Sequence, residues 1–299
     1  HMYIHCGFRN CKDQNDFFRR MVNELYVKGY AVSLATLILS LVIFLGFRSL
    51  RCTRIRIHVH LFTSLAFTCI GWIVWYKTIV EKPENNRNSQ AYCILLNLLL
   101  HYLMLANYFW MFCEGLHLHL VLVVVFVKDT VVMRWFMVIG WLAPLLFVIT
   151  YGVARAHHPT DDTYCWMEDS ELMWLLTIPV LLSLTASFSN SIPVQLNPPP
   201  SFYIIFLHSQ QVPLFGLQHM LLPFRPDSGT DLERIYQILS AVLVSLQGLC
   251  VSCLFCFANH DVVFAIRCVA SRFFPGFVAP IPTGSNTGAL ATQSRELGV

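Results

Sequence analysis

Charged side chains are scarce in this sequence. Only 12% of its 299 residues are Asp, Glu, Lys or Arg, whereas 56% are hydrophobic, and ordinary globular domains are about one quarter charged. The uncharged residues form long blocks, and no charged side chain occurs from Gly29 to Phe47. A soluble protein of this composition would lack the polar faces that cover a surface in water. The scarcity therefore argues against an ordinary soluble domain and indicates a membrane protein.

The apolar blocks predict an all-α fold, a seven-transmembrane helix bundle, because a bilayer core takes about 20 apolar helical residues. The bundle is expected over residues 25–258, after a short extracellular segment at 1–24. A short amphipathic cytoplasmic helix at 259–275 and a disordered cytoplasmic tail at 276–299 are expected to follow. The predicted spans are 25–47, 56–80, 93–127, 133–154, 171–190, 202–224 and 234–258.

The distribution of charge predicts the orientation in the membrane. The segment "RSLRCTRIR" after the first span carries four arginines and no acid, whereas "HHPTDDTYCWMEDSE" after the fourth span is acidic. The positive-inside rule therefore predicts a multi-pass protein of the plasma membrane with its N-terminus outside and its C-terminus in the cytoplasm. The net charge of +3 comes from such anchoring residues, so we expect a lipid bilayer and no nucleic acid as partner.

Sequence motifs of enzymes are also missing. HExxH, GxSxG and Walker-type loops do not occur. The Glu-x-x-His at Glu114–His117 has no second copy, which a di-iron bundle would need. We therefore expect no enzymatic activity, no metal and no cofactor. A proton-coupled transporter or channel that uses Glu114 and neighbouring histidines stays open as an alternative, although no internal repeat typical of transporters is found.

Polar side chains nevertheless occur inside the third predicted span. Asn107, Glu114 and His117 share one stripe of a helix, and a carboxylate at membrane depth almost always faces a partner in the bundle interior. Arg54 and His58 share one face of the second span and lie at the same depth. The spacing predicts a polar latch, formed by Arg54, His58 and Glu114, between the two spans. A purely structural ion pair is the alternative.

Four cysteines lie in the predicted extracellular parts, where disulfides persist. Cys93 begins the third span and Cys165 lies in the loop after the fourth span. A bridge between these two would tie the loop over the mouth of the bundle. Cys6 and Cys11 could pair with each other or with another chain, and their partners stay open.

Several motifs, in this order along the chain, resemble the secretin family of peptide-hormone G-protein-coupled receptors. They are "FRSLRCTRIRIH", "NYFWMFCEGLHLH", "GWLAP", "PLFGLQHMLLPFRP" and "LQGLCVSCLFCF". The resemblance runs from about residue 26 to 188 and from 212 to 274, and it looks most like the calcitonin-receptor arm, which includes pigment-dispersing-factor receptors. It implies a receptor for a peptide hormone or neuropeptide that signals through a stimulatory G protein and cyclic AMP.

The resemblance also implies roles for individual residues. It pairs Cys93 with Cys165 as the family's shared disulfide. It makes the polar latch part of an inner network that holds the receptor inactive and rearranges when a G protein binds. The implied positions are His208 and Phe255 in this network, Asn107, Pro213, Gly216, Gln247 and Gly248 at the centre and hinges, Trp141 and Pro144 in the fourth-span signature, and Tyr30 and His101 in the peptide pocket.

The chain departs from the family pattern in two places. Only residues 1–24 precede the first span, where the family has a cysteine-rich extracellular domain. Residues 189–211 resemble nothing in the family and contain three consecutive prolines, which cannot continue a helix. His208 and Phe255 fall where the family has hydroxyl groups. We expect the block to be a translated intron or a splice error, and the chain to bind peptide weakly and couple poorly to a G protein.

Overall fold

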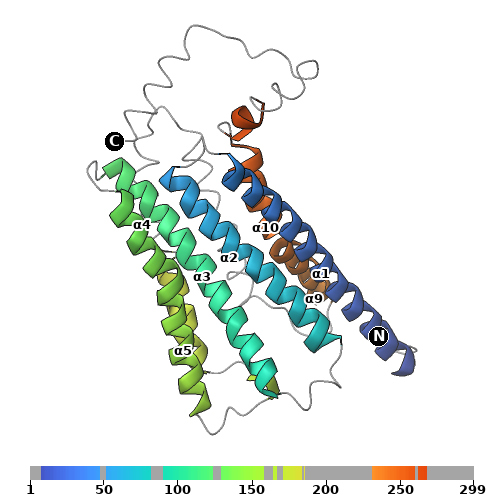
Figure 1. Ribbon diagram of the computed structural model, residues 1–299. Coiled ribbons are helices and arrows are strands. Elements are labelled where there is room, and N and C mark those ends of the chain that lie inside the picture. Colours follow the sequence, from blue (N-terminus) through green and yellow to red (C-terminus); the bar gives the residue numbers. More distant parts are fainter. Residues whose placement is uncertain are drawn as a thin grey trace. The chain divides into compact units, whose positions relative to one another are not determined.

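The computed structural model describes most of the apolar blocks as helices (Figure 1). The residues that it describes are 8–47, 52–81, 90–123, 129–157, 164–166, 171–183, 185, 231–259 and 262–267. The chain divides into two compact units, His1–Phe257 and Ala258–Val299. In the second unit, residues 262–267 are helical.

The helices of the first unit follow the order of the apolar blocks. α1, α2 and α3 come first, α4 and α5 form one continuous rod through a π-helical turn, and α9 and α10 follow near the end. Their bounds are α1 Phe8–Gly46, α2 Thr53–Trp75 with a π-helical turn at Tyr76–Val80, α3 Gln90–Val123, α4 Asp129–Met137, a π-helical turn at Val138–Leu142, α5 Ala143–Ala156, α9 Asp231–Ser245, α10 Gln247–Ser252 and a π-helical turn at Cys253–Phe257.

Four of these rods are long and apolar enough to cross a membrane, and the bent pair α9–α10 makes up to five among the residues that the structure describes. They correspond to the first four predicted spans and the seventh. A shorter apolar helix, Trp174–Ser183, falls in the fifth predicted span, and the sixth, 202–224, lies outside the described residues. α1 begins at Phe8, earlier than the span expected from residue 25. Polar residues can continue an α-helix beyond the apolar segment that crosses the membrane, and a prediction from hydropathy does not include them.

The helices pack side by side, with α2 in contact with both α1 and α3. α1 also contacts α9 and α10, and α3 contacts α5. Side chains between the rods, such as Leu37, Ile57 and Trp110, are fully buried. Large apolar side chains point outward as well, and Val42 and Leu146 are 63% and 58% exposed. An apolar exterior around an apolar interior is the pattern of a bundle that is dissolved in lipid.

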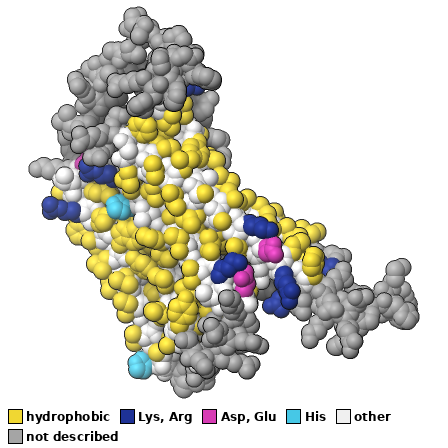
Figure 2. Space-filling model, turned by 45° about the vertical axis from the view of Figure 1, so that its right-hand side comes forward, with side chains coloured by type: hydrophobic (Ala, Val, Ile, Leu, Met, Phe, Trp, Pro, Cys, Tyr) yellow, Lys and Arg dark blue, Asp and Glu magenta, His cyan; other side chains and the backbone are white. Residues whose placement is uncertain are grey.

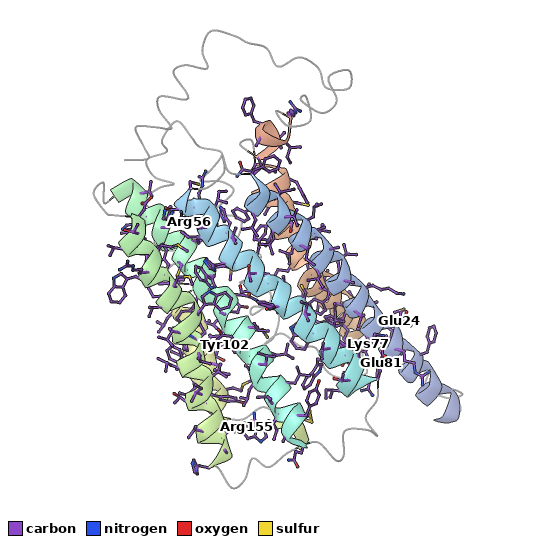
Figure 3. The ribbon with its side chains drawn as sticks, in the orientation of Figure 1. Glu24, Arg56, Lys77, Glu81, Tyr102 and Arg155 are labelled. Carbon is purple, nitrogen blue, oxygen red and sulfur yellow. A yellow bond between two sulfur atoms is a disulfide. The ribbon has the colours of Figure 1, made fainter. Side chains whose placement is uncertain are left out.

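Charged groups lie toward the ends of the rods. In Figure 2 a broad hydrophobic band separates the Lys, Arg, Asp and Glu side chains on the face that is shown. Figure 3 shows Arg56 near one end of α2 and Lys77 and Glu81 near the other. Lys77 Nζ and Glu81 Oε1 form an exposed ion pair at 2.8 Å. We call the end of the bundle with Glu81 the pocket end and the end with Arg56 the latch end.

The helix formed by α9 and α10 bends by 41° around Leu246. In an unbroken α-helix the Leu249 amide would donate a hydrogen bond to the Ser245 carbonyl. Here the Ser33 hydroxyl of α1 donates to the Ser245 carbonyl at 2.6 Å and accepts from the Leu249 amide at 3.2 Å. A side chain inserted into the hydrogen-bond ladder is a known cause of sharp bends. Ser33 therefore satisfies both backbone groups that the bend separates.

Two glycines allow α1 to approach this bend closely. A Cβ atom at Gly248 would lie 2.7 Å from Leu37 Cδ1 and 2.9 Å from Ser33 Cβ. A Cβ atom at Gly29 would lie 2.6 Å from Ser245 Cβ. Real Cβ atoms do not come this close to such neighbours, so a larger residue would push α1 away from the bend. Gly248 is one of the hinge positions that the resemblance implies.

Candidate functional site

The polar latch joins α2 and α3 in the bundle interior. His58 Nδ1 lies 2.7 Å from Glu114 Oε1, and the two side chains are only 2% and 3% exposed. Arg54 lies one helical turn before His58 and is half-buried. Since an ionisable group in a bundle core is costly unless it is paired, this contact holds the two helices in one register. The structure therefore brings together His58 and Glu114, two of the three residues in the predicted latch.

Aromatic side chains from two further helices enclose His58. The Phe255 ring, from the π-helical turn after α10, lies 4.9 Å from the His58 ring, centroid to centroid, and Phe255 is 4% exposed. The Phe44 ring of α1 lies 6.5 Å from the same imidazole. The latch end of α10 is thus in contact with the His58–Glu114 pair through a phenyl ring. A phenyl ring has no hydroxyl, so Phe255 cannot donate a hydrogen bond to the latch.

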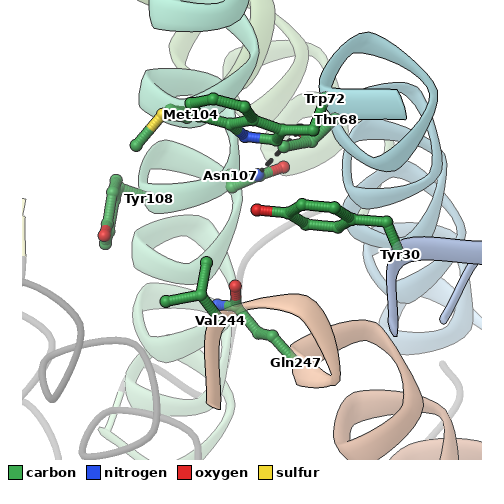
Figure 4. Close-up of a pocket in the computed structure, with 8 residues that line it drawn as sticks. All are labelled: Tyr30, Thr68, Trp72, Met104, Asn107, Tyr108, Val244 and Gln247. Carbon is green, nitrogen blue, oxygen red and sulfur yellow. Dashed lines mark hydrogen bonds between the residues drawn. The ribbon is translucent and has the colours of Figure 1, made fainter. Parts of the chain in front are cut away.

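A second polar connection between α2 and α3 lies nearer the middle of the bundle. The Asn107 side-chain amide donates to Thr68 Oγ1 at 3.0 Å, and that hydroxyl donates to the Ser64 carbonyl at 2.8 Å. Figure 4 shows Asn107 beside Tyr30 and Gln247, around a cavity of about 20 Å³. Sequence reasoning singled out Asn107 and Gln247 but missed Thr68, because a lone threonine in an apolar helix commonly bonds only its own backbone.

A larger cavity, which we call the aromatic pocket, lies at the pocket end and has a volume of about 310 Å³. Ligand sites in proteins measure about 300–1,000 Å³. Tyr30 and His101, the two implied pocket positions, both line it. One wall is a stack in which the Tyr30 ring lies 6.2 Å from the Trp72 ring at 3° and Tyr26 lies 5.4 Å from Tyr76. Such a wall offers a large, rigid contact area to a ligand.

The far side of the aromatic pocket is formed by α9. Tyr236, Ser240 and Val244 of this helix line the cavity. The Tyr26 hydroxyl donates to Ser240 Oγ at 3.5 Å, which joins α1 to α9 across the pocket. Val244 lies directly before the bend that Ser33 supports. A group bound in the pocket would therefore touch the same helix whose other end reaches His58 through Phe255.

A disulfide ties an outer loop to the pocket end of α3. Cys93 and Cys165 are bonded, with a Cα–Cα distance of 5.3 Å. Cys165 and Trp166 both have left-handed backbone conformations, with φ of 59° and 53°, which non-glycine residues rarely adopt. The Asn97 amide donates to the carbonyls of both at 3.2 Å. Asn97 also lines the aromatic pocket, so it links the loop to the cavity.

Sequence reasoning did not identify Asn97. The residue stands alone in the apolar run "ILLNLLL", and buried polar side chains in such runs need a partner. The isolated asparagine in this run is therefore a sign of a polar contact. Its partners lie in a loop about 70 residues away, and no periodicity in the sequence indicates them. The Arg155 side chain of α5 is almost fully buried, and its guanidinium lies 5.5 Å from the centroid of the Trp166 ring. A second helix therefore contacts the same loop segment.

The fourth-span signature residues, Trp141 and Pro144, lie where the α4–α5 rod packs against α3. The Trp141 ring meets the Trp110 ring edge-on at 5.8 Å, and the His60 ring stacks on Trp110 at 4.7 Å and 12°. Gly140 makes room for this indole, because a Cβ there would lie 2.8 Å from two Trp110 ring atoms. Pro144 is buried in the first turn of α5. The three rings pack against one another between α2, α3 and the π-helical turn after α4. Neither Trp141 nor Pro144 lines the two cavities described above.

Three of the implied positions lie outside the described residues, namely His208, Pro213 and Gly216. Among the residues that the structure does describe, no group of three or more His, Cys, Asp or Glu is placed to hold a metal ion.

Apolar rods, a buried His58–Glu114 pair and a ligand-sized cavity at one end of the bundle define an α-helical membrane protein. The sequence model of the seven-transmembrane receptors of the secretin family matches residues 20–192, which is more than half of the chain. The chain belongs to this family. The expected all-α, seven-transmembrane fold and the resemblance to the family are therefore confirmed.

Among the curated relatives is the calcitonin gene-related peptide type 1 receptor of Danio rerio, which is 31% identical over 277 residues that cover 87% of this chain and 58% of the relative. The calcitonin receptor of Homo sapiens is 30% identical over 81% of this chain and 53% of the relative. The vasoactive intestinal polypeptide receptor of Carassius auratus is 30% identical over 88% and 63%. The chain thus spans less than two thirds of the length of these relatives.

Proposed function

We propose that this protein is a plasma-membrane receptor for a peptide hormone or neuropeptide of the calcitonin-like or pigment-dispersing-factor-like type. It signals through a stimulatory heterotrimeric G protein and cyclic AMP, with its N-terminus outside and its C-terminus in the cytoplasm. The names of the relatives support the ligand class, since they are receptors for calcitonin gene-related peptide, calcitonin and vasoactive intestinal polypeptide. The buried His58–Glu114 pair, at the end of the bundle opposite the aromatic pocket, is the observation that carries the proposal.

The peptide is proposed to enter the aromatic pocket with its N-terminal segment. There it contacts the wall formed by Tyr30 and Trp72 and displaces or replaces the Tyr26–Ser240 hydrogen bond between α1 and α9. A ligand shifts an equilibrium between two conformations only through contacts that differ between them. The 3.5 Å bond between Tyr26 and Ser240 is such a contact, because it is weak enough to be exchanged for a bond to the peptide.

The α9–α10 rod provides the proposed connection to the latch. Its pocket half carries Ser240 and Val244, its bend is held by Ser33, and Phe255 at its latch end packs on His58. A rotation at the bend would move the phenyl ring off the imidazole and loosen the His58–Glu114 contact. A rigid element with two arrangements is a physical route by which one site biases another.

The sequence of residues 189–211 supports a weak response from this particular chain. This segment lacks the basic residues that a cytoplasmic loop offers to a G protein. We therefore propose a chain that inserts in the membrane but couples poorly to a G protein.

The test uses two chains expressed in mammalian cells, with cyclic AMP as the readout. One is this chain, and the other is a repaired chain in which 189–211 is replaced by the corresponding segment of the Danio rerio relative. Both carry that relative's ectodomain in place of residues 1–24, so that they differ only at 189–211. Calcitonin-type, calcitonin-gene-related and pigment-dispersing-factor peptides are added in turn. We expect a peptide-dependent rise in the repaired chain only. A repaired chain that reaches the surface and responds to none of them contradicts the receptor proposal, and a full response from the unrepaired chain contradicts its impairment.

A buried carboxylate–imidazole pair would also serve as part of a proton path, which is the basis for the alternative of a proton-coupled transporter or channel. Membership in a receptor family favours the receptor function over the transporter or channel. The Glu114 substitution described below separates the two.

A further inference from the structure

A groove at the latch end is not used by the proposed signalling function. It has a volume of about 380 Å³ and is lined by residues of α1, α2 and α4. Its walls include the apolar side chains Leu45, Ile55, Val59 and Met133, and its two polar lining residues are Arg56 and His60. The volume lies in the range of ligand sites in proteins.

The position of Arg56 gives the groove one charged rim. Its side chain is exposed, and among the described residues no ion pair is formed by it. Asp129, an acid at the same end of the bundle, accepts a hydrogen bond from Thr53 Oγ1 at 2.8 Å. A guanidinium presents a planar fork of N–H donors that matches a phosphate or a carboxylate. Arg56 thus offers a cationic binding group next to apolar walls (Figure 3).

His60 lies deeper in the groove and is held in place. Its ring stacks on the Trp110 indole at 4.7 Å and 12°, and it is half-buried. It therefore adds a fixed polar group below the exposed arginine. The groove then combines a charged rim, a polar middle and an apolar floor, which is the order of groups in a phospholipid from its phosphate through its ester linkages to its acyl chains.

We propose that this groove binds one anionic phospholipid of the membrane leaflet at the latch end. Arg56 pairs with the phosphate of a headgroup that carries a net negative charge, which a zwitterionic headgroup lacks because its ammonium group offsets the phosphate charge. The ester region lies at His60, and an acyl chain packs on Leu45, Val59 and Met133. Basic pockets between membrane helices on the cytoplasmic side bind anionic lipid headgroups. A sterol is a poorer match, because its single hydroxyl carries no charge for the guanidinium. The assignment of this groove to the inner leaflet depends on the proposed orientation. The preference for an anionic headgroup does not depend on it.

The bound lipid is in a position to influence the latch. Phe44 lines the groove, and its ring also lies 6.5 Å from the His58 ring and 5.5 Å from the Phe62 ring. An acyl chain against Phe44 would limit the space into which this ring can move. Occupancy of the groove therefore favours the arrangement in which Phe44 packs on His58.

The experiment measures lipid binding to the full chain in detergent micelles by native mass spectrometry. Palmitoyl-oleoyl phosphatidylserine and phosphatidylcholine, which share acyl chains, are the probes. We expect one phosphatidylserine to bind more tightly than any phosphatidylcholine. Arg56→Gln should weaken that binding about fivefold, the effect of removing one membrane-facing cation. Arg134→Gln is the matched control, since Arg134 is also an exposed arginine at the latch end but does not line the groove.

A second variant tests the groove without changing any charge. Val59→Phe places a larger apolar side chain in the cavity and should reduce phosphatidylserine binding while Arg56 is intact. Its thermal unfolding without added lipid shows whether the fold is retained. Equal binding of the two phospholipids, equal losses in Arg56→Gln and Arg134→Gln, or displacement of phosphatidylserine by cholesterol would each overturn the proposal. None of these outcomes depends on peptide or G protein, so they leave the proposed receptor function to its own test.

Discussion

At the scale of single residues, the His58–Glu114 pair is the contact whose removal should have the largest effect on stability and function. Both groups are almost fully buried and 2.7 Å apart, and removal of one partner leaves the other buried without it, which destabilises a protein by about 1–3 kcal/mol and by more where the group is charged. If the latch opens on activation, part of this loss of stability affects the closed conformation only. The pair therefore sets both stability and, in the proposed function, the resting balance between two states.

Glu114→Gln should raise basal cyclic AMP severalfold in the repaired chain, because the amide keeps the shape of the carboxylate but removes its charge from His58. Glu81→Gln is the matched control: Glu81 pairs with Lys77 at the exposed pocket end, where ion pairs contribute about 0–1 kcal/mol. Basal signalling is measured without peptide and corrected for surface expression. Unchanged basal signalling together with loss of a proton current would instead favour the transporter alternative.

The residues of the candidate site differ in how far the sequence predicts them. Glu114 and His58 are predictable, because a carboxylate in an apolar run demands a partner and the helical period of α2 supplies one. Ser33, Thr68 and Asn97 are not. A small polar side chain in a membrane helix can bond its own backbone, as Thr68 also does, and only the packing of the neighbouring helix or loop decides whether it bonds across.

At the scale of elements, the bent rod α9–α10 depends on a hydroxyl from another helix. Ser33 bonds the Ser245 carbonyl and the Leu249 amide, so the bend cannot be inferred from the sequence of the rod itself. The expected span, 234–258, overlaps α9 and α10 but contains no proline that would indicate a bend. Gln247 and Gly248 mark the position only through the family resemblance.

Ser33→Ala should lower the thermal stability of the purified chain by about 1–3 kcal/mol, because the two backbone groups at the bend lose their partner. Thr36→Ala is the control on the same helix. Its hydroxyl bonds only the α1 carbonyls of Val32 and Ser33, so a change well under 1 kcal/mol is expected. Thermal unfolding in micelles gives both values. Similar losses in the two variants would contradict the role assigned to Ser33.

The segment Tyr164–Trp166 is attached to α3 by a disulfide. Cys93 and Cys165 are 72 residues apart, and the closure of a loop of that length restricts the unfolded chain enough to contribute about 4 kcal/mol. Asn97 adds two hydrogen bonds to the same segment. These contacts therefore hold Cys165 and Trp166 against the pocket end of α3.

Reduction of this disulfide should lower the midpoint of thermal unfolding and weaken peptide binding in the repaired chain. Asn97→Ala should weaken peptide binding about fivefold or more while the disulfide remains, since the carbonyls of Cys165 and Trp166 lose their donor. Binding is measured with a labelled peptide on cells, and surface expression is the internal control. Unaltered peptide affinity in both cases would show that the loop does not shape the pocket.

At the scale of the whole bundle, the two ends carry different structural features. The pocket end carries the aromatic wall, the disulfide and exposed ion pairs, and the latch end carries the buried pair and the groove with Arg56. α1 is common to both, because it lines the aromatic pocket with Tyr30, supports the bend with Ser33 and contacts His58 with Phe44. Motion of α9–α10 against this fixed helix is therefore the simplest route between the two ends.

The orientation of the bundle has a direct chemical test at Cys52. This free thiol is exposed and directly precedes α2, beside the arginines that the positive-inside rule places in the cytoplasm. A membrane-impermeant maleimide should therefore label Cys52 only after the cells are permeabilised. Cys52→Ser is the control, and the difference between the two chains removes the signal of the other thiols. Transfer of several guanidinium groups across the bilayer is highly unfavourable, so the orientation should be uniform, and Cys52-dependent labelling of intact cells would reverse the assignment of both ends.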